Sequence, residues 1–250
     1  MEYNRFVDLS KSYLYCQLQR SAGTRTKNSN MHPKLPFVTI SREAGTGESE
    51  ITASILDELN KIQDPEECPW TLYDKELVRK VVEDYNISGI QSLLPEKKFS
   101  EIQMMFEELF GLHPTKREMA HNISKSIQRL ADMGNAIVVG RGAFYITRHN
   151  SNALHIRLIG SMAKRVKHMV NEYSMSLRRA EDYIIKEDHE RREYVKKLFG
   201  VDLNDPHYYD MVINTDKLSV QEITEMVCLE VLALKQNLAL SEHIEELSPI

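Results

Sequence analysis

The sequence predicts an α/β protein in which a parallel sheet of five strands is covered by helices on both faces. Short apolar runs alternate with amphipathic helical patterns along most of the chain, as in parallel sheets whose strands are joined by helices. The first apolar run leads directly into a glycine-containing turn, and a helical pattern follows at once. With 250 residues, of which 42% are hydrophobic and 28% charged, the chain is long enough to bury a full core.

The first 36 residues are expected to lie outside the sheet domain. Apolar residues at helical spacing predict an amphipathic helix over residues 6–18, and the composition of residues 21–36 is typical of a linker. We interpret the helix as peripheral, and a helix that binds a partner or forms a homodimer is the alternative. The sheet domain is expected at residues 37–238, followed by an acidic tail at residues 239–250.

The order of the elements within this domain can be predicted from the apolar pattern. A β-branched run at residues 37–40 predicts the first strand. Further strands are expected at residues 70–73, 136–139, 154–159 and 211–213. Helices are expected at residues 50–62, 75–85, 99–112, 118–133, 162–173, 177–199 and 220–238.

The turn after the first strand has the composition of a phosphate-binding loop. It contains Gly45, Thr46 and Gly47, and the helix begins near Glu48. Glycines let backbone N–H groups converge on an anion, and the helix N-terminus adds about half a positive charge. Ligands of open parallel sheets bind beyond the carboxyl ends of the strands, where this turn is expected to lie. An ordinary turn between a strand and a helix is the alternative that this composition leaves open.

The turn departs from the P-loop pattern G-x-x-x-x-G-K-[ST] at two defining positions. When Gly47 is aligned with the second glycine, Arg42 replaces the first. Glu48 then replaces the lysine, and Ser49 matches the Ser/Thr position. Because a glutamate would repel phosphate, we expect Glu48 to point toward solvent or an arginine. We expect Arg42 to reach back to the β- or γ-phosphate and the Ser49 hydroxyl to bind Mg²⁺. The predicted nucleotide-binding residues are therefore Gly45, Thr46, Gly47, Glu48 and Ser49.

Seven segments, which keep one order along the chain, resemble the cytidylate kinase-like family, a branch of the nucleoside monophosphate kinases. They are residues 40–51, 73–77, 140–146, 155–158, 188–191, 199–202 and 205–216. The resemblance implies a P-loop NTPase fold with a helical lid. It also implies an enzyme that uses ATP and Mg²⁺ to phosphorylate a nucleoside monophosphate, with CMP or dCMP as the default acceptor.

The resemblance implies roles for residues on the acceptor side of the site. Arg141 matches an arginine that contacts the acceptor phosphate, and Gly142 stands where the family has an aspartate. Asp74 and Arg79 fall where the family places acceptor-binding residues, although Asp74 also suits the N-cap of the expected helix 75–85. Arg165 begins the helix that enters the lid and is counted with the acceptor-binding residues.

The resemblance also implies roles on the lid. Asp188 and Arg191 match an Asp-x-x-Arg motif whose arginine clamps the transferring phosphate. Arginine suits this chemistry because its planar fork binds phosphate oxygens in pairs and stays charged. A moving lid would close over both nucleotides and exclude water. A solvated charged helix is the alternative for the residues around Arg191. The predicted catalytic residues are Arg42, Arg141, Asp188 and Arg191.

Composition and cysteine spacing indicate which binding partners and which cellular compartment to expect. A net charge of −5 and a pI near 6.0 argue against general nucleic-acid binding, and no apolar stretch is long enough to span a membrane. Cys16, Cys68 and Cys228 are far apart and lack zinc-binding spacing, so we expect reduced thiols in a cytoplasmic protein. Arg148 and Arg157 are expected at the surface or at strand ends.

Two other functions stay open from the sequence. Gly142 in place of the aspartate is compatible with a kinase that acts on another small acceptor. Glu48 in place of the lysine is compatible with a nucleotide-binding regulator that has little or no catalytic activity.

Overall fold

The computed structural model of the chain describes residues 2–23, 34–74 and 116–247, and it contains a five-stranded sheet in the order β2-β3-β1-β4-β5. All four neighbouring strand pairs are parallel, which confirms the predicted α/β class. The strands are β1 (Phe37–Arg42), β2 (Thr71–Tyr73), β3 (Ala136–Val139), β4 (Ala153–Ile159) and β5 (Met211–Asn214). The helices predicted at residues 75–85 and 99–112 lie outside the described residues, as does Arg79.

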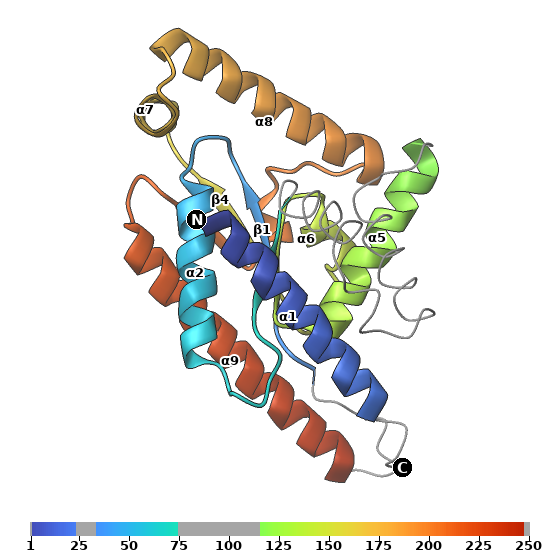
Figure 1. Cartoon of the computed structure of the whole chain (residues 1–250). Helices are drawn as coiled ribbons and strands as arrows, with labels where there is room; N and C mark the ends of the chain where they lie inside the picture. Colours follow the sequence, from blue (N-terminus) through green and yellow to red (C-terminus); the bar gives the residue numbers. More distant parts are fainter. Residues whose placement is uncertain (1, 24–33, 75–115, 248–250) are drawn as a thin grey trace.

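Helices cover both faces of the sheet, with α2 and α9 on one side and α5 and α6 on the other (Figure 1). The helices are α1 (Glu2–Gly23), α2 (Glu48–Ile62), α5 (Lys116–Met133), α6 (Ala143–Ile146), α7 (Met162–Tyr173), α8 (Leu177–Phe199) and α9 (Val220–Leu247), with a 3₁₀ turn at Pro206–Tyr208. None of these helices has the length and apolar character needed to cross a membrane.

The central strand β1 is enclosed on both faces. Phe37 and Val38 are adjacent and therefore point to opposite faces of the sheet, yet both are 0% exposed. This double burial explains why the strand carries apolar residues on both faces, and its polar residues Thr39 and Ser41 are buried as well. It also fixes the carboxyl end of β1, from which the glycine-containing loop leaves the sheet.

The last helix is longer than predicted. The sequence pattern predicts an end at residue 238 followed by an acidic tail, whereas α9 continues to Leu247. The extension contains neither glycine nor proline, and most of its residues favour helices, so nothing in the local sequence ends the helix at residue 238.

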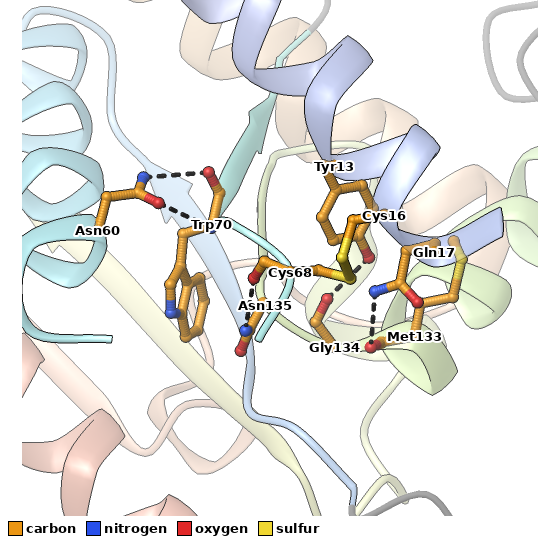
Figure 2. The surroundings of a disulfide bond; sticks show 9 residues. All are labelled: Tyr13, Cys16, Gln17, Asn60, Cys68, Trp70, Met133, Gly134 and Asn135. Atoms are coloured by element: carbon orange, nitrogen blue, oxygen red, sulfur yellow. Dashed lines mark hydrogen bonds between the residues drawn. A yellow bond between two sulfur atoms is a disulfide. The ribbon is translucent and has the colours of Figure 1, made fainter. Parts of the chain in front are cut away.

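The N-terminal helix α1 is part of the core, and the interpretation of it as peripheral is wrong. It packs on the edge strand β2, where the hydroxyls of Ser10 and Thr71 lie 2.9 Å apart. The fully buried Tyr13 donates a hydrogen bond of 2.7 Å to the carbonyl of Gly134, and Gln17 donates to the carbonyl of Met133 (Figure 2). These contacts join α1 to β2 and to the turn between α5 and β3.

A disulfide bond joins Cys16 of α1 to Cys68, which precedes β2 (Figure 2). The expectation of reduced thiols is therefore wrong for these two residues, while Cys228 is free and buried. The partners are 52 residues apart, so only the folded chain reveals that they meet. Cytoplasmic localisation stays a prediction, and the disulfide argues against it because such bonds are rare in reducing compartments.

Reducing the Cys16–Cys68 bond is expected to lower the free energy of unfolding by about 2–4 kcal/mol, because the cross-link restricts the unfolded chain. Urea unfolding with and without dithiothreitol measures the difference. A Cys16→Ser/Cys68→Ser variant serves as the control, since its stability should not respond to the reductant. Equal stability of the oxidised and reduced wild-type protein would contradict the prediction.

Candidate active site

The loop between β1 and α2 has a backbone suited to binding an anion. Gly45 and Gly47 adopt left-handed conformations, with φ angles of 80° and 74°. Gly47 is the N-cap of α2, and no side chain caps the helix. The first N–H groups of a helix have no acceptor within it, so this end of α2 can donate to phosphate oxygens. The Thr46 hydroxyl turns back into the loop and donates to the carbonyl of Glu43 at 3.0 Å.

Helix α7 packs directly on this loop and leaves no room for a side chain at residue 45. A Cβ atom on Gly45 would lie 2.9 Å from the backbone oxygen of Arg165 and 3.2 Å from Cγ of Met169. A Cβ on Gly47 would have more space, because its nearest neighbour is a ring carbon of His168 at 3.6 Å. The glycine at position 45 therefore permits close contact between the loop and α7, whereas Gly47 mainly supplies backbone freedom.

Glu48 faces an arginine, as the sequence analysis expected. The Nε of Arg42 donates to the Glu48 carboxylate at 3.1 Å, and both side chains are largely buried. The same guanidinium lies against Gly140 at the end of β3, where a Cβ would come within 2.6 Å of Nη1. Ser49 lies exposed in the first turn of α2. Arg42 thus connects the ends of two neighbouring strands with the start of α2.

Arg191 of α8 reaches the same place from the other side. Its Nη1 donates to the carbonyl of Arg42 at 3.2 Å, and its Nη2 donates to Glu187 at 3.4 Å. Burial and the nearby charge of Arg42 lower the pKa of Arg191 below its usual range. Two guanidinium groups from distant parts of the sequence are therefore held together at the carboxyl end of β1.

Arg141 follows Gly140, the residue that lies against the guanidinium of Arg42. Its backbone is left-handed, with φ of 57°, and its buried Nε has no hydrogen-bond partner within the described part of the chain. The buried hydroxyl of Tyr194 also has no partner there, and the electrostatic influence of Arg141 on it shows that the two groups are neighbours. Burial nevertheless raises the pKa of Tyr194. Sequence reasoning missed Tyr194, although it lies one helical turn beyond Arg191 and shares its side of α8.

Asp188 and Arg165 contact the loop itself. One carboxylate oxygen of Asp188 accepts the Ala44 amide at 2.7 Å, and the other accepts Nη1 of Arg165 at 2.6 Å. Arg165 also donates to the carbonyls of Ala44 and Gly160, at 3.1 and 3.0 Å. Both side chains were predicted to meet substrate or phosphate, and the structure engages them with protein groups.

Asp74, Arg148 and Arg157 are the remaining residues whose positions were predicted from the sequence. Asp74 directly follows β2, at the same edge of the sheet as the loop. Arg148 is exposed, as expected. Arg157 was expected at the surface or a strand end, but it is 4% exposed and donates to Ser41 and Asn204. Residue 157 lies opposite Ser41 in the sheet register, and the hydrogen bond to Asn204 joins its side chain to the segment before β5.

The parallel sheet, the glycine loop after β1 and the two helices that cover it define the chain as an α/β protein of the P-loop kinase class. Residues 37–217 match the model of the cytidylate kinase-like family, and the chain belongs to this family. Membership of this family indicates a nucleotide kinase.

The proteins that this chain resembles have low sequence identity to it. A cytidylate kinase of Thermoplasma acidophilum is 26% identical over 195 residues, which cover 74% of this chain and 87% of the relative. A cytidylate kinase of Pyrococcus horikoshii is 24% identical over 155 residues, covering 60% of this chain and 78% of the relative. The structure of an uncharacterized protein from Eubacterium ventriosum covers 80% of this chain and 99% of its own, with a TM-score of 0.56 and 19% identity, and shares the fold.

Replacing Gly45 with alanine is expected to destabilise the protein more than the same change at Gly200. Both glycines have positive φ angles, 80° and 73°, so each alanine carries the left-handed penalty of about 1–2 kcal/mol. Only the Cβ at residue 45 meets other atoms, which adds about 1–3 kcal/mol of overpacking. Thermal and urea unfolding of the two variants measures the difference, and equal losses would show that α7 does not press on the loop.

Proposed function

We propose that the protein transfers the γ-phosphoryl group of ATP, with Mg²⁺, to a nucleoside monophosphate, with CMP or dCMP as the default acceptor. The convergence of Arg42 and Arg191 beside the glycine loop carries this proposal, and Arg141 follows Gly140, which lies against Arg42. Phosphoryl transfer depends on positioning and on neutralising negative charge, and arginines at the end of a parallel sheet supply both. The names of the relatives, both cytidylate kinases, support the choice of a cytidine nucleotide.

The residues present fit the phosphate groups of a nucleotide. The donor phosphates would be held by backbone amides around Gly45 and Gly47 and by the uncapped start of α2. The unpartnered Nε of Arg141 is a donor suited to the acceptor phosphate.

The described residues offer few protein ligands for Mg²⁺. They contain no cluster of three acidic, histidine or cysteine residues, so the ion would depend on the Ser49 hydroxyl, phosphate oxygens and water. A bound Mg²⁺ would supply positive charge that offsets part of the charge of the phosphates. The chain's own contribution is then to hold Ser49 at the start of α2 beside the loop.

Phe199 limits how the acceptor base can be recognised. A Cβ on Gly142 would lie 2.2 Å from Cε2 of Phe199, so the position that carries an aspartate in the resembling kinases has no room for one here. Any recognition of cytosine must use other groups. This observation keeps a different small acceptor as the second candidate for the same chemistry.

The Arg42–Glu48 pair opposes nucleotide binding. At about 4 Å and an effective dielectric near 20, a unit charge pair is worth roughly 4 kcal/mol, and screening reduces this for partly exposed groups. A phosphate must therefore compete with Glu48 for Arg42. The same pair supports the alternative of a nucleotide-binding regulator with little catalysis. A small-molecule partner, a homodimer through the N-terminal helix and cytoplasmic localisation stay predictions.

The proposed activity predicts diphosphate formation when the protein is mixed with ATP, Mg²⁺ and common nucleoside monophosphates, with CMP or dCMP preferred. Arg191→Gln should reduce kcat about 100-fold or more, because the variant lacks the positive charge that would stabilise the transferring phosphate. Arg192→Gln is the matched control, since Arg192 is exposed on the same helix. If no monophosphate yields a diphosphate, the proposal fails.

Glu48→Gln is expected to raise the affinity for ATP about fivefold to tenfold, because Arg42 no longer has a carboxylate partner. Calorimetry with ATP and Mg²⁺ measures the change, and parallel kinetics shows whether turnover rises with it. Tight binding without turnover in both proteins would favour the regulator. Unchanged affinity would show that position 48 lies outside the nucleotide site.

A further inference from the structure

The residue that precedes Gly45 is held at both ends of its backbone by two different helices. The amide of Ala44 donates to Asp188 of α8 at 2.7 Å, and its carbonyl accepts from Arg165 of α7 at 3.1 Å. Asp188 and Arg165 are themselves joined at 2.6 Å. The loop, the carboxylate and the guanidinium therefore form a closed ring of contacts.

Burial isolates this ring from solvent. The side chains of Arg165 and Asp188 are only 8% and 13% exposed. Glu43 extends the ring, because its carboxylate accepts the Gly160 amide at 3.0 Å and lies 3.6 Å from Nε of Arg165. The Ala44 side chain is buried in an apolar cluster with residues of both helices, namely Met169, Ala180 and Ile184. Polar and apolar contacts thus fix the same point of the loop.

The two named positions of the Asp-x-x-Arg motif face different parts of the loop. Asp188 holds the amide of Ala44, whereas Arg191 meets the carbonyl of Arg42 and the guanidinium region beyond it. Nε and Nη1 of Arg165 both donate to protein acceptors. Asp188 and Arg165 therefore make their hydrogen bonds with protein groups in and around the loop, while Arg191 lies beside Arg42.

We infer that Asp188 and Arg165 are positioning residues that set the backbone of the glycine loop for the donor phosphates, and that neither is a catalytic residue. This inference rests on the proposed function for its link to ATP. Backbone donors stabilise a phosphate only when they are fixed before it binds. In a loop whose lysine position is a glutamate, these donors carry more of the phosphate binding, so their orientation has greater effect.

The test compares Asp188→Asn and Asp188→Ala with Glu190→Gln, a control on the same helix whose side chain is 58% exposed. Asparagine keeps an acceptor for Ala44 and loses the charge that pairs with Arg165, whereas alanine loses both. A positioning role predicts a KM for ATP that rises about tenfold in the asparagine variant and more in the alanine variant. It also predicts that kcat stays within about fivefold of wild type and that the pH profile does not move. The control should match wild type.

Hydrogen exchange at the Ala44 amide gives a readout independent of activity. The positioning role predicts that exchange in Asp188→Ala accelerates at least about tenfold at Ala44, while amides in α9 keep their wild-type rates. Unchanged exchange at Ala44 would overturn the inference. So would a kcat loss beyond about 100-fold with an unaltered KM for ATP, which would make Asp188 catalytic. Faster exchange in a protein that phosphorylates nothing would support the inference and refute the proposed function.

Discussion

Close approach of the α7 backbone to Gly45 is the constraint on which the arrangement of the site depends. The atoms that a side chain at residue 45 would meet include the backbone oxygen of Arg165, which cannot move without moving the helix. Because the loop and α7 touch in this way, the Arg165 guanidinium reaches the carbonyl of Ala44 and pairs with Asp188. The lid helices α7 and α8 are therefore packed onto the loop (Figure 1), and any movement of the lid must break buried polar contacts.

The charges around the loop follow one pattern. Each of the carboxylates Glu43, Glu48 and Asp188 accepts from, or lies within 4 Å of, an arginine. The acidic residues therefore do not simply repel an incoming phosphate, because arginines already offset them. Arg42 differs in one respect, because its hydrogen bond to Glu48 must break before this arginine can bind a nucleotide. The Nε of Arg141 has no such competitor among the described residues.

The elements of the sheet could be predicted from the sequence because they depend on local patterns. A strand buried on both faces is a short, mostly apolar run: residues 136–139 are all apolar, and residues 37–40 are β-branched or aromatic with Thr39 as the one polar residue. The loop was recognisable because only glycine adopts left-handed conformations freely. Electrostatics predicted that Glu48 would point toward solvent or an arginine, and the structure has the arginine. These features need no knowledge of which distant residues meet.

The features that were missed or misjudged depend on contacts between distant segments. Nothing near Cys16 or Cys68 indicates that they lie side by side, and the amphipathic pattern of α1 fits a peripheral helix as well as a docked one. Arg157 looked like a strand-end residue because its hydrogen-bond partner in the segment before β5 comes 47 residues later. The catalytic role predicted for Asp188 stays a prediction, and the sequence does not show its contacts with the Ala44 amide and with Arg165, which come from distant segments.

The docking of α1 has a consequence for where the folding unit begins and ends. The segment that matches the family starts at residue 37 and ends at residue 217, so it contains neither α1 nor α9. Yet Tyr13 of α1 and Val227 and Val231 of α9 belong to the same apolar cluster as β1. A fragment trimmed to the shared segment would lose the contacts of α1 with β2 and of α9 with α2, so part of the core of this chain is supplied by sequence outside the family region.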